Sequence, residues 1–308
     1  MPFCNQHLID MAGTVDHWEL GLSTWDPSWV QGFESILSIG NGRIGQRANF
    51  EEAYSGGSLQ GSYLAGVYYP DKTKVGWWKN GYPEYFAKVL NSTNWIGIDV
   101  KVDGESLDLA KAQSVDQFVW GLNMQDGILK RSFSCTMQNG AAIQVVAERF
   151  CSMHNPELGC LRYRVEAGGH LVEVMPYLDA GVTNADSNWN DAFWSIHEVA
   201  HHGPGKACVR AETNKTHFGA AFAMNALAHV TDSLGQRELA HAHLESDASR
   251  VGIGFQAQLS SGESLTLEKY VGICTTLQHE AQELVGAALA HSDAAAACGW
   301  ESLVESHQ

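Results

Sequence analysis

The sequence predicts a mainly β protein: a large antiparallel β-sandwich, of super-sandwich size, followed by a short helical segment at the carboxyl end. From Trp25 to about Thr276, short runs of alternating or β-branched residues are separated by Gly, Asn, Asp and Pro, which is typical of an antiparallel all-β domain. Several separators are hairpin turn sequences. Beyond Thr276 the β-branched runs stop and helix-forming residues dominate. We therefore divide the chain into a β-sandwich domain, residues 1–276, and a helical linker, residues 277–308.

Two stretches show the strand pattern most clearly. Residues 94–102 alternate with a period of two, and Asp103-Gly104 follows them as a hairpin turn signal, because glycine tolerates the positive φ of a type I′ turn. Residues 138–140, Gln-Asn-Gly, precede the apolar run 141–146 in the same way. Both stretches predict antiparallel strands that are joined by tight turns.

The carboxyl-terminal residues predict two helices. Residues 278–289 have helix-forming composition and spacing, and Ser292-Asp293 is a suitable amino-terminal cap for a second helix toward Gln308. A sandwich does not need these helices, so we interpret them as a connector to a further domain. A connector without its partner leaves part of its apolar face uncovered. We therefore expect residues 278–308 to be helical but poorly anchored.

The composition excludes several classes of partner. Nineteen Lys and Arg against 35 Asp and Glu give a formal net charge of -16, which repels nucleic acid and anionic membranes. The start, MPFCNQHLID, lacks the basic and apolar regions of an export signal, and no stretch approaches the ~18 apolar residues of a membrane span. The cysteines are scattered and never spaced as Cys-x-x-Cys, so no disulfide framework or zinc ribbon is indicated. We expect a soluble, cytoplasmic protein.

Two motif matches lack the context that their chemistry needs. Residues 40–45, GNGRIG, have the spacing of a dinucleotide-binding loop, but no βαβ unit surrounds them, and a hairpin fits better. Residues 197–201, HEVAH, have the zinc-protease spacing, which requires a helix. Their surroundings favour a strand, on which the two histidines would lie about 13 Å apart. We interpret His241 and His243 as a solvated pair, with weak metal binding on a strand face as the alternative.

A longer pattern resembles a known family. Residues 32–52, GFESILSIGNGRIGQRANFEE, are similar to the opening signature of glycoside hydrolase family 65, which includes glycoside phosphorylases. The similarity continues in order through residues 61–68, 81–84, Asn91, Asn94-Trp95, 122–131 and 148–152. Arg43, Gln46 and Ala48 depart from the family's usual residues, and these departures concern the subfamily more than the family.

The residues of this signature also have structural interpretations. The glycines and Asn41 fit turn geometry. We interpret Arg47 and Arg149 as buried residues that form structural ion pairs with the nearby Glu51, Glu52 and Glu148.

The resemblance implies an amino-terminal β-sandwich that is followed by helical linkers, an (α/α)6 barrel and a small carboxyl-terminal sandwich. In the family, the catalytic glutamate and the phosphate-binding residues lie in the barrel, which the resemblance places beyond Gln308. We therefore assign no catalytic residue, metal or cofactor to the chain, and expect it to be inactive alone. The implied reaction of the parent protein is inverting phosphorolysis of an α-linked glucosyl disaccharide, such as maltose, kojibiose, nigerose or trehalose. Inorganic phosphate is the co-substrate, and β-glucose 1-phosphate and glucose are the products.

Two alternatives stay open. In the first, the parent protein is a trehalase-like hydrolase of the same family. In the second, the chain acts alone as a carbohydrate-binding or assembly module. The implied partners are the catalytic barrel, the disaccharide and, in a homodimer, a second copy of the chain.

Residues 68–95 are more aromatic than a solvent-exposed loop should be. In the family, a loop of this sandwich reaches toward the mouth of the barrel's active site, and aromatic rings suit the apolar faces of glucose. The resemblance therefore implies that a loop here contacts substrate, with the candidate residues Trp77, Trp78, Tyr82, Glu84 and Tyr85. The alternative is that these rings plug the edge of the sandwich or a dimer interface.

Overall fold

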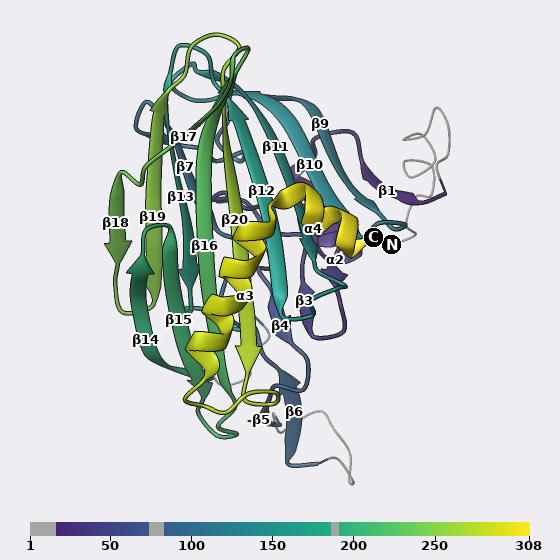
Figure 1. Cartoon of the computed structure of the whole chain (residues 1–308). Coiled ribbons are helices and arrows are strands. Elements are labelled where there is room, and N and C mark those ends of the chain that lie inside the picture. The colour runs from purple at the N-terminus through teal and green to yellow at the C-terminus, as the bar shows by residue number, and fades with distance from the viewer. Residues whose placement is uncertain (1–16, 74–82, 186–190) are drawn as a thin grey trace.

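Strands are the main secondary structure of the described residues, and the helices lie toward the two ends of the chain (Figure 1). The structure is a computed structural model in which residues 17–73, 83–185 and 191–308 are described. Within these residues the paired strands run antiparallel, and a short helical segment closes the chain. The prediction of a mainly antiparallel β fold with a carboxyl-terminal helical segment is confirmed.

The longest strands, β16 and β20, pair with each other in the middle of the large sheet. In chain order the elements are β1 (Glu19–Leu22), η1 (Pro27–Trp29), α2 (Val30–Ile36), β2 (Ile39–Gly40), β3 (Ile44–Gln46), β4 (Ser62–Leu64), β5 (Tyr68–Lys72), β6 (Tyr85–Val89), β7 (Ile98–Val102), β8 (Glu105–Ser106), β9 (Ser114–Asn123), β10 (Ile128–Thr136), β11 (Ala142–Cys151), β12 (Leu158–Glu166), β13 (Leu171–Asp179), β14 (Trp194–Gly203), β15 (Lys206–Thr213), β16 (Gly219–Asp232), β17 (Gly235–Glu238), β18 (His243–Ser246), β19 (Arg250–Gln258), β20 (Ser264–Thr275), α3 (Leu284–Cys298) and α4 (Trp300–His307).

Two sheets form the sandwich. The large sheet has the order β1-β9-β10-β11-β12-β20-β16-β15-β14, with β17 paired to β16, and the smaller sheet has the order β18-β19-β13-β7-β8. Alternate residues of both sheets point inward, as their pleat requires. Val145, Tyr163 and Leu267 of the large sheet share one buried cluster with Val174 and Ile253 of the smaller sheet. This shared core holds the two sheets face to face.

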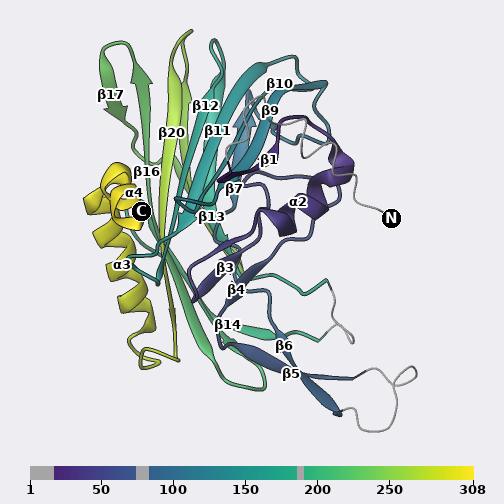
Figure 2. The same cartoon turned by 90° about the vertical axis from the view of Figure 1, so that its right-hand side faces the viewer.

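The amino-terminal segment lies on the same side of the large sheet as the smaller sheet. Figure 2 shows α2, β3 and β4 on this side and α3 and α4 on the opposite side. A group of aromatic rings joins the segment to β9, with Trp25 and Phe50 packed against Phe118 and Trp120 at centroid separations of 5.1 Å. Phe33 of α2 is buried in the same cluster.

Several predicted turns and strands are present. Asp103 and Gly104 have positive φ between β7 and β8, and Gly140 has positive φ between β10 and β11. Residues 40–45 form the β2–β3 hairpin rather than a nucleotide-binding loop. Residues 197–201 lie within strand β14, so the HExxH spacing does not bring its histidines together.

The carboxyl-terminal segment differs from its prediction in two ways. The first helix, α3, begins at Leu284 rather than near residue 278, and Ser292 is fully buried inside it instead of capping a second helix. The break between α3 and α4 comes at Gly299, where φ is +78°. A polar residue can pack in a helix interior when its hydroxyl has a partner, and Ser292 Oγ donates to Leu289 O at 3.0 Å.

The expectation of poor anchoring is also wrong. Leu284 and Ala288 of α3 pack against Cys208, Ala221 and Cys274 on the outer face of the large sheet. In α4, Trp300 and Leu303 pack against a second buried cluster on the same face, with Phe150 and Tyr270. Small residues on both surfaces allow this contact, which covers the apolar face of the helices without any further domain. Within the described residues, no helix has the length and apolar character needed to cross a membrane.

Gly272 of β20 generates the first prediction, because a Cβ atom there would lie 2.0 Å from Ala288 O of α3. We expect Gly272→Ala to push α3 off the sheet and to lower the free energy of unfolding by about 1–3 kcal/mol. Hydrogen exchange in residues 284–298 should become faster. Gly286→Ala is the matched control, because its Cβ meets nothing within 4 Å and alanine in a helix gains about 0.5–1 kcal/mol. Equal stability of the two variants in urea unfolding would contradict the close packing of α3.

Candidate functional site

The predicted aromatic segment contains the hairpin β5–β6, which extends from one end of the sandwich (Figure 1). Trp77, Trp78 and Tyr82 lie outside the described residues. Glu84 is exposed, and its carboxylate lies 3.8 Å from Lys72 Nζ. Tyr85 opens β6 with 47% of its surface exposed. The structure therefore places two of the five candidate residues, Glu84 directly before β6 and Tyr85 at its first position.

The rings of this segment divide into buried and exposed groups. Tyr69 is buried against Phe193 at a centroid separation of 4.7 Å, and Trp95 is fully buried in the main core. These two rings stabilise the sandwich and cannot reach a ligand. Tyr68, Tyr85 and Phe86 keep 42%, 47% and 42% of their surfaces exposed on the hairpin, and the ring of Tyr68 also packs against Phe218 at a centroid separation of 5.4 Å.

The hairpin is attached to the large sheet through the turn between β15 and β16. Thr216 Oγ1 donates to Tyr68 O at 2.7 Å, and Lys215 Nζ lies 4.4 Å above the ring of Tyr69. Between the two strands, Lys88 Nζ contacts the buried carboxylate of Asp71 at 3.0 Å. These contacts hold the base of the hairpin in one position, which a binding surface requires.

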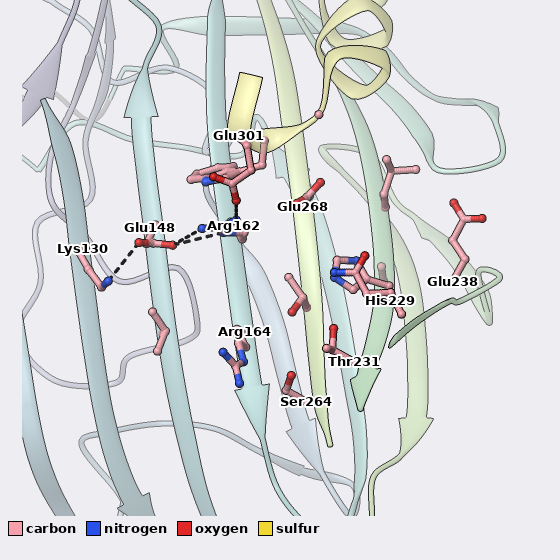
Figure 3. Close-up of a pocket in the computed structure, with 17 residues that line it drawn as sticks. Lys130, Glu148, Arg162, Arg164, His229, Thr231, Glu238, Ser264, Glu268 and Glu301 are labelled. Atoms are coloured by element: carbon pink, nitrogen blue, oxygen red, sulfur yellow. Dashed lines mark hydrogen bonds and ion pairs between the residues drawn. The ribbon is translucent and has the colours of Figure 1, made fainter. Parts of the chain in front are cut away.

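A concave region lies on the outer face of the large sheet, beside α4 (Figure 3). This open groove has a volume of about 930 Å³. Figure 3 shows a row of charges across three adjacent strands and α4: Lys130 contacts Glu148 at 3.2 Å, Glu148 contacts Arg162 at 2.9 Å, and Arg162 contacts Glu301 at 2.7 Å. The Arg162 guanidinium also lies 4.6 Å above the ring of Trp300.

The electrostatics of this groove do not suit acid catalysis. A general acid at neutral pH needs a raised pKa. Burial would raise the pKa of Glu148, but hydrogen bonds and charge from Arg162 and Lys130 hold it below its usual value. Burial lowers the pKa of His229 on the opposite wall. Glu148 is therefore an ionised partner of two cations, and the row of charges fastens α4 to the sheet.

A cluster of buried charges forms around Glu51 and Glu52 of the family-like signature. Arg131 of β10 donates to Glu52 Oε1 at 2.7 Å and to Glu51 Oε2 at 2.6 Å. Arg149 of β11 pairs with the other oxygen of Glu51, and Tyr163 Oη donates to Glu52 Oε2 at 3.1 Å. The five side chains are buried and form what we call the ionic core. Their hydrogen bonds satisfy charges that would otherwise be costly to bury.

The pKa values in the ionic core follow from these contacts. Burial alone would raise the pKa of Glu51, but Arg149 and Arg131 hold it below its usual value. Burial alone would lower the pKa of Arg131, but Glu52 and Glu51 raise it. Burial, together with the charge of Glu52, raises the pKa of Tyr163 well above its usual value. Glu51 therefore stays ionised, and the cluster is structural.

Sequence reasoning found only part of this arrangement. The structural ion pair of Arg149 with Glu51 is confirmed, whereas Glu148 points to the outer face and pairs with Arg162. Arg47 contacts Glu34 at 3.9 Å instead of joining the ionic core. The role of Arg131 was not predicted, because its position in an alternating strand does not reveal which carboxylates lie opposite.

Asn41 confirms the turn interpretation of the signature. Its Oδ1 accepts from the backbone N–H groups of Arg43 and Ile44 at 3.0 and 2.9 Å. Its Nδ2 donates to Ser152 O at 2.8 Å. Gly42 has φ of +85° at the tip of the turn. The motif therefore closes the β2–β3 hairpin and ties it to the turn that follows β11.

Comparisons with known proteins identify the chain's relatives. A family model described as glycosyl hydrolase family 65, N-terminal domain, matches residues 21–308. Maltose phosphorylase from Bacillus subtilis (strain 168) is 44% identical over 192 residues, which cover 62% of this chain and 25% of that protein. Alpha,alpha-trehalose phosphorylase from Thermoanaerobacter brockii is 26% identical over 287 residues, which cover 88% of this chain and 36% of that protein. The chain thus spans well under half of these relatives.

A solved structure supports the fold. The structure of a putative kojibiose phosphorylase from the human microbiome superimposes with a TM-score of 0.81 over 94% of this chain and 37% of the other chain, at 21% sequence identity. At this identity the likeness concerns the fold alone.

Arg131 generates the second prediction. Arg131→Ala should lower the free energy of unfolding by about 3–5 kcal/mol, because it leaves Glu52 without its cation in the core. The stabilisation from the lowered pKa of Glu51 is present above its usual value of 4.5 and is lost as pH falls through the folded value. The difference in free energy of unfolding between the wild type and Arg131→Ala should therefore become smaller when urea unfolding is repeated below pH 4.

The matched control for Arg131→Ala is Arg164→Ala, which removes an exposed arginine that pairs with Glu166 on the same sheet. Arg164→Ala should lower the free energy of unfolding by less than about 1 kcal/mol. If Arg131→Ala does not fold, Arg131→Lys keeps one charge and tests the same contact. Similar stabilities for the Arg131 and Arg164 variants would contradict the importance of the ionic core.

Proposed function

The chain belongs to glycosyl hydrolase family 65 as its amino-terminal domain, and we propose that it is the non-catalytic domain of a glycoside phosphorylase. The observation that carries this proposal is the match over residues 21–308, together with relatives named as maltose, trehalose and kojibiose phosphorylases. The proposed role of the domain is to support a carboxyl-terminal catalytic barrel and to supply a loop near its active site. A homodimer and a cytoplasmic location are parts of the same proposal.

The proposed reaction of the parent protein is inverting phosphorolysis of an α-linked glucosyl disaccharide. A glutamic acid of the barrel protonates the departing oxygen while inorganic phosphate attacks the opposite face of the sugar, which yields β-glucose 1-phosphate and glucose. Phosphate is already an anion, so this attack does not need the second carboxylate that activates water in an inverting hydrolase. Maltose is the first substrate to test, because the maltose phosphorylase is 44% identical and the trehalose and kojibiose enzymes are 26% and 28% identical.

The hairpin β5–β6 supports the proposed loop role. Its base is fixed to the large sheet and it exposes Tyr68, Tyr85 and Phe86. The groove of Figure 3 offers a weaker ligand site, because its charges already pair with one another. The hairpin is therefore the part of the sandwich that we assign to contact with the barrel and with disaccharide.

Two further candidates remain distinct from this proposal. A trehalase-like parent would need a carboxylate in place of phosphate ligands in the barrel. A stand-alone carbohydrate-binding module is favoured by one observation, the exposed rings of the hairpin. Titration of the chain with maltose or trehalose, monitored by tryptophan fluorescence, separates the module from the non-catalytic domain. Saturable binding favours the module, and no response favours the domain.

The third prediction concerns the chain by itself. Purified residues 1–308 should release no glucose 1-phosphate from maltose and phosphate, because the proposed catalytic acid and phosphate site belong to the barrel. Fusion of the chain to the carboxyl-terminal part of the Bacillus subtilis maltose phosphorylase should restore the reaction. Release of glucose 1-phosphate by the chain alone, from a preparation free of host enzymes, would contradict the non-catalytic role.

The fourth prediction concerns Trp78 and Tyr82, which lie in the sequence between β5 and β6, in that fusion protein. Trp78→Ala or Tyr82→Ala should lower kcat/KM for the disaccharide severalfold, because each removes a ring that we propose to stack on glucose, worth about 0.5–1.5 kcal/mol. Leu234→Ala is the control, since Leu234 is almost fully exposed in the turn between β16 and β17. Unchanged kinetics for both aromatic variants, with the fold intact by circular dichroism, would refute the loop role.

A further inference from the structure

Four side chains with metal-binding atoms meet where α3 crosses the end of β20. They are Glu157 from the turn before β12, Cys274 from β20, His279 from the β20–α3 connection and His291 from α3. One ligand atom of each lies within 4.8 Å of the ligand atoms of the others. Glu157 is central, because its carboxylate lies 2.9 Å from His279 Nε2 and 3.1 Å from His291 Nε2.

The fold holds this group in place through its backbone. Ile273 N–H donates to Glu157 O at 2.8 Å, which fixes the turn before β12 beside β20. Asn155 Oδ1 accepts from Glu157 N–H at 3.1 Å within the same turn. Cys274 points to the outer face of the sheet, into the buried cluster with Ala288 of α3. Because α3 packs on the sheet through Ala288, the same helix brings His291 to the carboxylate of Glu157.

We propose that Glu157, Cys274, His279 and His291 form a binding site for a divalent transition-metal ion of the zinc class. Imidazole nitrogen, thiolate sulfur and carboxylate oxygen are the ligands that zinc prefers, and four such groups complete a tetrahedral site. The ion would join α3, β20 and the turn before β12. This inference is independent of the proposed function, because it concerns the attachment of the helical segment and not the reaction.

The spacing of the four ligand atoms fits such an ion. Bonds of 2.0–2.3 Å in a tetrahedron place neighbouring ligand atoms roughly 3.3–3.8 Å apart. In the structure the four ligand atoms lie at most 4.8 Å apart. Side-chain rotations that move these atoms by about 1 Å therefore bring them to the distances of a tetrahedral site. The two histidine nitrogens, now 2.9 and 3.1 Å from the carboxylate, would move slightly away from Glu157.

The competing arrangement is a hydrogen-bonded network without an ion. In it, both histidines donate from Nε2 to Glu157, and Asn155 Nδ2 donates to His291 Nδ1 at 2.9 Å. Arg43 Nη1 supplies a further contact to Glu157 at 3.2 Å. The Arg43 side chain is 42% exposed at the rim, so it can turn toward solvent when an ion takes its place. The two arrangements can be distinguished at Cys274, because only the metal site requires its sulfur.

The test uses the tag-free chain of residues 1–308, stripped of metal with a chelator and titrated with Co²⁺ and then Zn²⁺. We expect one equivalent of Co²⁺ to bind, with the absorption bands of a tetrahedral ion and of a cobalt–sulfur bond, and Zn²⁺ to displace it. Zn²⁺ should also raise the melting temperature, because an ion that binds only the folded state stabilises it.

Substitutions assign the ligands. Cys274→Ser should remove the cobalt–sulfur band, and His279→Ala or His291→Ala should weaken Co²⁺ binding more than about tenfold, since even residues that only orient a ligand commonly contribute that much. Cys208→Ala is the matched control, a buried cysteine in the same cluster that is not among the four ligands. His217→Ala is the exposed histidine control.

Two outcomes would overturn the proposal. One is wild-type protein that binds Co²⁺ no better than the double variant His279→Ala/His291→Ala. The other is Co²⁺ binding that keeps its spectrum and affinity in Cys274→Ser, which would place the ion elsewhere. The Co²⁺ titration of the wild-type chain is itself a test, since absence of Co²⁺ binding there overturns the proposal even if a variant does not fold. His279→Gln keeps the side-chain volume and serves where His279→Ala is unstable.

Discussion

The ionic core is the constraint on which the rest of the structure depends. Arg131 pairs Glu51 and Glu52 of the amino-terminal segment with the large sheet. Arg149 Nη1 donates a hydrogen bond to Asn49 O of the same segment at 2.8 Å. The backbone of the same segment also accepts a hydrogen bond from the smaller sheet, from Ile98 N–H to Glu51 O at 2.8 Å. Buried charges tolerate few geometries, because a misplaced partner leaves an ion without compensation. The cluster therefore sets where the amino-terminal segment lies relative to both sheets.

The fold class was predictable from sequence because its determinants are local. Alternation with a period of two and glycines at positive φ, such as Gly140, depend on neighbouring residues alone. The strand order was not predictable, because β20 pairs between β12 and β16, more than 30 residues away in sequence from either partner. The start of α3 was misplaced for a related reason: residues 278–283 have helix-forming composition, but the contacts of Leu284 with the sheet decide where the helix begins.

The candidate sites show the same limit more sharply. The aromatic segment drew attention through composition, yet composition could not separate buried Tyr69 from exposed Tyr85. The HExxH spacing at residues 197–201 suggested metal chemistry and lies on a strand. The four residues that do bring metal-binding atoms together are spread from Glu157 to His291 and form no motif. Buried Lys269 is a further example, since its Nζ donates to Tyr177 O of the smaller sheet and to Gly97 O, directly before β7.

Two regions of the sandwich differ in how their side chains are satisfied: the outer face of the large sheet and the hairpin β5–β6. On the outer face, Lys130, Glu148, Arg162 and Glu301 neutralise one another across β10, β11, β12 and α4 (Figure 3). A face whose charges are satisfied internally has little electrostatic energy to offer a ligand, so its role is to fix the helices. The hairpin β5–β6 instead exposes rings on a base that Thr216 fixes to the large sheet. Apolar surface gains free energy when a partner covers it, and our proposal that the hairpin contacts the barrel and the disaccharide rests on this exposed surface.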